Sequence, residues 1–103
     1  MKTKLFFLFS LLSFCLSSQT TYDLDWSFNS ANQEITIEVG DIVRWTWSGA
    51  GTHNLLKLSG PEAGFGNDSQ RYSSGHVYSH TFTSQGVNTY HCSPHPDSMY
   101  GTV

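Results

Sequence analysis

The sequence predicts an all-β fold, a sandwich of two sheets, and three observations carry this prediction. Apolar and polar residues alternate along several short segments, as they do in strands with one buried face. Turns that contain glycine separate these segments at fairly regular intervals. Beyond the apolar N-terminus, no stretch repeats its apolar residues at helical spacing. With 103 residues, the chain has room for one small domain of this kind.

The first three expected strands follow one another closely. Residues 22–28 alternate apolar and polar side chains, and so do residues 34–39, with three β-branched apolar residues on one face. Gly40-Asp41 then interrupts the pattern before a third strand at residues 43–47. Short strands separated by turns in this way are typical of a β-sandwich.

Two more strands are expected in the second half. Residues 78–83 alternate, and a Ser-Gln-Gly turn leads into residues 87–92. The long connection at residues 59–75 is rich in Gly, Pro and Ser, which suits a surface loop that crosses between the sheets. So small a domain depends on its large aromatic residues for a core. The tryptophans expected there are Trp26, Trp45 and Trp47.

Residues 1–18 have the pattern of a secretory signal peptide. A basic start precedes an apolar stretch that is too short to span a bilayer, and small residues follow it. Cleavage there leaves a mature domain at residues 19–103, periplasmic or secreted. A retained membrane anchor is an alternative. Lipid attachment at Cys15 fits less well, because the bulky Phe14 precedes it.

The mature part is acidic. Removal of Lys2 and Lys4 leaves three basic residues against eight acidic ones, a formal charge of −5. This charge argues against nucleic acid and anionic membrane surfaces as partners. It is compatible with a cationic protein partner, although solubility alone explains it equally well.

Soft metal ligands gather near the end of the chain. Cys92, His95 and Met99 lie within eight positions, and His53 lies far upstream. Cys92 is the sole thiol of the mature part, so it forms no internal disulfide and must be buried, paired between chains or bound to something. A thiolate, two imidazoles and a thioether are the ligand set of a blue-copper site. Zinc makes little use of a thioether, and calcium and magnesium prefer oxygen.

These residues and their spacing resemble the plastocyanin/azurin (cupredoxin) family. The resemblance covers essentially the whole mature chain and implies a Greek-key β-sandwich that binds one type 1 copper ion. It implies His53, Cys92 and His95 as trigonal ligands and Met99 as the axial ligand. The matching segments hold these ligands and the glycines around them: 40–45, 51–54, 86–95 and 99–101.

The resemblance also implies roles for residues around the ligands. Asn54 matches a family asparagine that hydrogen-bonds the cysteine sulfur through its backbone and the following residue, here Ser93, through its side chain. Such bonds raise a reduction potential; alternatively, Asn54 merely begins a strand. His91 occupies the position of a surface aromatic linked to electron exit, or is simply a solvated strand residue. His80 is expected to be packed or at an edge and His76 exposed, neither as a ligand.

Two features leave alternatives open at the metal site. Three residues separate His95 from Met99, whereas family loops usually contain four or two, so the axial distance is open. Met99 alternatively fills a gap in the core. A cupredoxin that has lost its metal, with Cys92 as a buried apolar residue, is a further alternative.

The function expected from this pattern is that of a soluble, exported, monomeric one-electron carrier between redox protein partners. No catalytic constellation appears, so we expect no enzyme activity. The alternatives are a copper storage or delivery protein and a cupredoxin-fold module of a longer secreted protein. The family's closing strand normally runs beyond Gly101-Thr102-Val103, so this strand is expected to be shortened or the sequence to be a piece of a longer chain.

Overall fold

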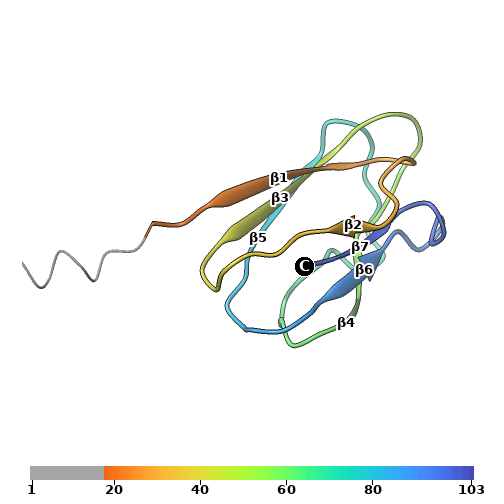
Figure 1. The fold of residues 1–103 in the computed structure, drawn as a ribbon. Helices are drawn as coiled ribbons and strands as arrows, with labels where there is room; N and C mark the ends of the chain where they lie inside the picture. The colour runs from red at the N-terminus through yellow and green to blue at the C-terminus, as the bar shows by residue number, and fades with distance from the viewer. Residues whose placement is uncertain (1–17) are drawn as a thin grey trace, which may run out of the picture.

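The computed structural model describes residues 18–103, which form seven strands in two sheets (Figure 1). The expected signal peptide lies outside the described residues except for Ser18. Within residues 18–103 no helix is long and apolar enough to cross a membrane. The strands are β1 (Thr21–Trp26), β2 (Gln33–Glu34), β3 (Ile42–Trp47), β4 (Leu56–Ser59), β5 (Val77–Thr81), β6 (Thr89–His91) and β7 (Tyr100–Thr102).

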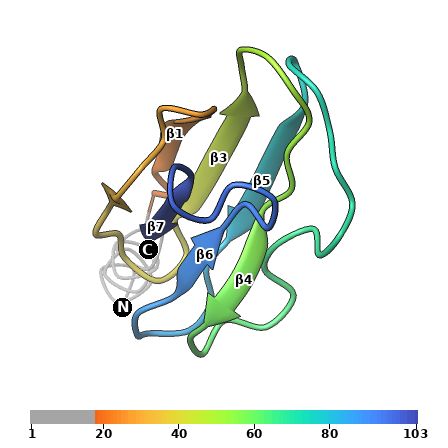
Figure 2. The same ribbon diagram turned by 90° about the vertical axis from the view of Figure 1, so that its right-hand side faces the viewer.

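The two sheets pack face to face. One has the strand order β1-β3-β5 and the other the order β2-β7-β6-β4. β1 runs parallel to β3 and β2 parallel to β7, while the remaining neighbours are antiparallel. Figure 2 shows β7, β6 and β4 in front of β1, β3 and β5. The predicted all-β sandwich is confirmed.

β3 shows how the alternating sequence builds the core. Val43, Trp45 and Trp47 are at most 1% exposed, whereas Arg44 and Thr46 between them face solvent. Trp26 from β1 packs edge-on against Trp47, with ring centroids 6.5 Å apart. All three predicted core tryptophans are therefore buried, and truncating one of them to alanine costs about 3–5 kcal/mol.

A hydrogen-bonded tyrosine crosses this core. Tyr90 in β6 is fully buried; its hydroxyl accepts a hydrogen bond from Trp45 Nε1 at 3.3 Å and donates one to Gln33 Oε1 at 2.7 Å. Burial raises the pKa of Tyr90 to about 12, against the opposing effect of Trp45. The hydroxyl therefore stays protonated and links β3, β6 and β2.

Tyr90→Phe is expected to lower the free energy of unfolding by about 1–3 kcal/mol, because it leaves the buried Trp45 N–H and the half-buried Gln33 side chain without their shared partner. Urea denaturation followed by tryptophan fluorescence measures this loss. Tyr100→Phe, at a more exposed tyrosine of β7, is the matched control and should change stability by less than about 0.5 kcal/mol. Equal losses in the two variants would contradict the proposed link.

The alternating segment at residues 34–39 departs from the prediction of a strand. β2 ends at Glu34, and residues 35–39 form no strand. The alternation still orients the side chains, since Ile35 and Ile37 are half-buried and Thr36 is exposed. Ile35 N–H donates to the Thr102 carbonyl at 3.2 Å, and no ladder bond beyond it extends β2 within residues 18–103. Alternation sets which face is buried, but a strand also needs a neighbour to pair with.

The connection from β4 to β5 does cross between the sheets, but it is more than a surface loop. Its residue Glu62 is 1% exposed, and the carboxylate accepts hydrogen bonds from His80 Nε2 at 2.7 Å and from the backbone N–H groups of Thr83 and Ser84, each at 2.9 Å. Burial alone raises the pKa of Glu62, but these hydrogen bonds outweigh it and hold the pKa below its ordinary value. We call this arrangement the Glu62 latch. His80 is half-buried against Phe65 and Phe82, so it is a packed histidine, one of the two positions, packed or edge, predicted for it.

Candidate metal centre

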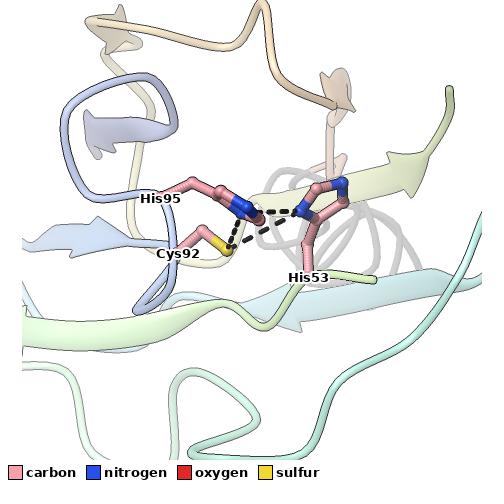
Figure 3. A group of neighbouring side chains, drawn as sticks. All are labelled: His53, Cys92 and His95. Carbon is pink, nitrogen blue, oxygen red and sulfur yellow. Dashed lines mark hydrogen bonds between the residues drawn. The ribbon is translucent and has the colours of Figure 1, made fainter. Parts of the chain in front are cut away.

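Three predicted ligands meet at one end of the sandwich (Figure 3). His53 lies between β3 and β4, Cys92 directly follows β6, and His95 lies in the loop to β7. The two Nδ1 atoms of the histidines are 3.2 Å apart. Cys92 Sγ lies 3.8 Å from Nδ1 of His53 and 3.5 Å from Nδ1 of His95.

These separations fit one small metal ion. Bonds of about 2.0–2.3 Å to nitrogen and thiolate place donor atoms roughly 3–4 Å apart around a shared ion. One thiolate with two imidazoles is also the trigonal donor set that type 1 copper takes. The chemistry and spacing of the side chains therefore both fit copper.

A backbone carbonyl sets the orientation of His53. Its Nε2 lies 3.0 Å from the carbonyl oxygen of Ala50, so Nε2–H donates there and the Nδ1 lone pair faces the other two ligands. His53 is also held by two backbone hydrogen bonds with Tyr72, each 2.9 Å, and by Trp47 Nε1, which donates to its carbonyl at 2.9 Å. The ring is thus aimed before any metal binds.

The loop that carries the other ligands folds onto itself. Cys92 N–H donates to the Met99 carbonyl at 2.9 Å, and the N–H groups of His95 and Met99 donate to the carbonyls of Cys92 and His95, at 3.0 and 3.1 Å. Pro94 and Pro96 flank His95 and restrict the backbone on both sides. Met99 is fully buried beside Cys92 in this turn.

The electrostatic environment favours neutral ligands in the metal-free protein. Burial raises the pKa of the Cys92 thiol, and the backbone N–H groups of Asn54 and His95, together with Arg71, oppose this rise. Burial, His53 and Arg71 all lower the pKa of His95. His95 is therefore ready to coordinate as a neutral imidazole, whereas Cys92 must release its proton when a metal ion binds.

Asn54 joins the segments behind the ligands. Its Oδ1 accepts a hydrogen bond from Ser93 N–H at 2.8 Å, and its amide group donates to Ser93 Oγ at 3.1 Å and to the Asp68 carbonyl. The neighbouring Leu55 N–H donates to Oδ1 of Asn67 at 2.7 Å, and Asn67 N–H donates to the Leu55 carbonyl at 2.9 Å. The loop expected only to cross the surface therefore also braces the segment that carries His53.

The other predicted histidines lie outside the ligand trio. His91 is half-buried in β6, and strand alternation turns it away from the buried Cys92. His76, expected at the surface, is half-buried and stacks on Tyr72 with ring centroids 3.6 Å apart. The aromatic neighbours Tyr72 and Trp47 explain this difference, because they provide an apolar site for the imidazole.

Sequence reasoning missed two residues at this site. Phe28, expected on the buried face of the first strand, lies beyond the end of β1 and packs against both histidine rings. The Ala50 carbonyl was missed because every residue has a backbone carbonyl, so the residue type does not indicate which one accepts a hydrogen bond from His53. The Gly-Ala-Gly run before His53 was the available signal for a close backbone approach.

Comparison with known proteins gives a consistent result. Residues 18–103 match the family model of copper binding proteins, plastocyanin/azurin family. A halocyanin from Natronomonas pharaonis is 40% identical over 72 residues, which cover 67% of this chain and 43% of that protein. An amicyanin from Paracoccus denitrificans is 35% identical over 63 residues, covering 61% and 48%. The chain thus matches less than half the length of these two relatives.

Solved structures agree with the sequence comparison. A mutant of amicyanin in its Cu(I) form superposes with a TM-score of 0.67 at 30% identity, covering 81% of this chain and 79% of that one. An oxidized mutant of amicyanin gives a TM-score of 0.55 at 28% identity, covering 82% and 78%. From the match along residues 18–103, the chain belongs to the plastocyanin/azurin family of copper-binding proteins, which confirms the resemblance inferred from its motifs.

Proposed function

We propose that this protein is a type 1 (blue) copper protein that carries single electrons between larger redox proteins. The observation that carries the proposal is the trio of donor atoms on His53, Cys92 and His95, all within 4.8 Å of one another. Copper, when bound, supplies a Cu(I)/Cu(II) couple and a strong blue absorption from thiolate-to-metal charge transfer. Met99 is the axial ligand in this proposal, supported by its burial within the ligand turn.

The surrounding residues suit a site that changes little between oxidation states. Ala50 and Tyr72 fix the His53 segment, and Asn54 ties it to Ser93 beside Cys92. Ligands held in this way move little when an electron arrives or leaves, which keeps the barrier to transfer low. We assign to Asn54 the additional role of raising the reduction potential, and to His91 that of a surface exit for electrons.

Export and partner choice belong to the same proposal. The signal-peptide pattern at residues 1–18 supports cleavage and a periplasmic or secreted protein, without stable membrane insertion. The acidic mature part favours cationic redox proteins over nucleic acid as partners. The protein acts as a monomeric carrier and not as an enzyme.

Retention of copper during redox cycling tests electron carriage against copper delivery. The ligands of a carrier suit both oxidation states, so copper should stay bound through repeated reduction and reoxidation in the presence of a mild Cu(I) chelator. Metal analysis before and after electrochemical cycling measures retention. Substantial loss on reduction would favour the delivery function, and failure to take up Cu(II) at all would remove the copper proposal.

Met99→Leu is expected to leave most copper binding intact, because the trigonal Cys92, His53 and His95 ligands dominate affinity. It should raise the reduction potential, since losing a weak donor destabilises Cu(II) more than Cu(I). Voltammetry of the loaded variant measures this shift. Leu55→Met, a change at a buried apolar residue of similar size, controls for repacking. An unchanged potential in Met99→Leu would assign Met99 to the core alone.

A further inference from the structure

The Phe28 ring packs against the imidazole rings of both His53 and His95. Its ring centroid is 4.8 Å from that of His53 and 4.5 Å from that of His95, and both ring pairs meet edge to face, at 90° and 73°. The two imidazoles are themselves 5.1 Å apart, so the three rings form one cluster. Phe28 is 43% exposed, which makes it the outer member of this cluster.

The backbone beneath Phe28 is anchored. Ser30 N–H donates to the Ser27 carbonyl at 2.9 Å, and Ser30 Oγ accepts from Ser27 N–H at 2.9 Å and donates to the Asp25 carbonyl at 3.0 Å. The Ser30 carbonyl in turn accepts from Tyr100 N–H in β7 at 3.1 Å. Phe28 therefore sits on a turn tied to both sheets, and its ring is presented from a fixed base.

Gly51 lies next to the Phe28 and His53 rings. A Cβ atom at Gly51 would lie 3.4 Å from Phe28 Cε2 and 3.5 Å from His53 Cε1. Its φ of +83° is a conformation that glycine adopts readily and other residues rarely do. A methyl group added at Gly51 would just touch both rings in ordinary van der Waals contact, so Gly51 borders the cluster without filling the space beside it.

We propose that Phe28 is a positioning residue that clamps the His53 and His95 imidazoles in their metal-binding orientation and limits the access of small molecules to them. This inference rests on the proposed copper function. A ring held edge-on against two imidazoles restricts their rotation, because each pair has a preferred mutual geometry. Ala50 already orients His53, so the main effect of the clamp falls on His95 in its loop.

Phe28→Ala and Phe28→Leu test the clamp, with Leu58→Ala as a matched change at an exposed apolar residue of β4. In the metal-free protein, nuclear Overhauser contacts should join Phe28 to both histidine rings. The His95 ring signals should broaden in Phe28→Ala and not in Leu58→Ala. A shift without broadening does not support the clamp, because loss of the Phe28 ring current shifts these signals in any case. In the copper-loaded protein, removal of Cu(II) by a small chelator should be about tenfold faster in Phe28→Ala. Phe28→Leu should give an intermediate rate.

The measurements on the metal-free and on the copper-loaded protein test the clamp and the copper function separately. A wild-type protein that takes up no copper overturns the proposed function, while the metal-free arm still decides the clamp. A His95 ring line width in Phe28→Ala that matches the wild type overturns the clamp, and so does a chelator rate within about twofold of the wild type. Thermal unfolding of each variant is the control for a general loss of stability. The melting temperatures should be similar to that of the wild type, because an exposed side chain contributes little to stability.

Discussion

Cys92→Ser is expected to abolish the blue absorption of the copper-loaded protein completely. A hydroxyl cannot replace the thiolate, because its proton is held far more tightly and its oxygen is a harder donor than sulfur. The side chain at this position is fully buried and serine is close to cysteine in size, so the fold should survive. Visible absorption and electron paramagnetic resonance spectra of protein titrated with Cu(II) give the result.

A matched histidine control separates site chemistry from incidental metal binding. His76→Gln removes an imidazole that stacks on Tyr72 outside the ligand trio, so the blue absorption should be unchanged. Blue colour that survived Cys92→Ser, or vanished in His76→Gln, would show that the site has been assigned to the wrong residues.

Glu62→Gln is expected to be strongly destabilising for a near-isosteric change. The amide keeps the shape of the side chain, and its oxygen can still accept the bonds from Thr83 and Ser84 N–H. It loses the carboxylate charge, and its NH2 group replaces the oxygen that lies against His80 Nε2. Removing the charge from a buried group that accepts such hydrogen bonds costs about 1.5–3 kcal/mol. In a domain of this size, that corresponds to a fall of roughly 6–24 °C in the melting temperature.

Thermal and urea denaturation measure this loss in parallel with Glu34→Gln, in which the carboxylate of an exposed β2 residue is removed. The control should stay within about 0.5 kcal/mol of the wild type. Similar stabilities for the two variants would mean that the Glu62 latch contributes nothing beyond packing.

The latch also predicts how stability depends on pH. The pKa of Glu62 is lower in the folded protein than in the unfolded chain, where it is about 4.3. Its contribution is therefore fully present above that value and is lost as the pH falls through the folded pKa. The difference in unfolding free energy between wild type and Glu62→Gln should stay constant near neutral pH and shrink in acid. A difference that grew in acid would reverse the sign of the pKa shift.

The fold was predictable where local alternation and packing agree. β3 is the clearest case, since Trp45 and Trp47 alternate with polar residues and both are buried. Residues 36–39 show the limit, because they continue the alternation and yet lack a ladder partner in the described chain. Pairing depends on a distant segment, and a local pattern carries no information about it.

The cluster of three donor residues was predictable for a different reason. Copper chemistry restricts the ligands to a few residue types, and these are visible in the sequence as Cys92, His95 and His53. The groups that orient them are not restricted in this way. A carbonyl at Ala50 and an aromatic edge at Phe28 act through tertiary contacts, which neither spacing nor composition reveals.

The position of β7 has a consequence for the order in which the protein matures. β7 lies between β2 and β6 and follows both of them along the chain, so it leaves the ribosome after its neighbours. Pairing of strands so distant in sequence is slow, on the order of milliseconds to seconds. Until β7 pairs, the Cys92 N–H lacks its acceptor at the Met99 carbonyl. We therefore expect the turn that carries Cys92 and Met99 to reach its final form only after β7 has joined the sheet.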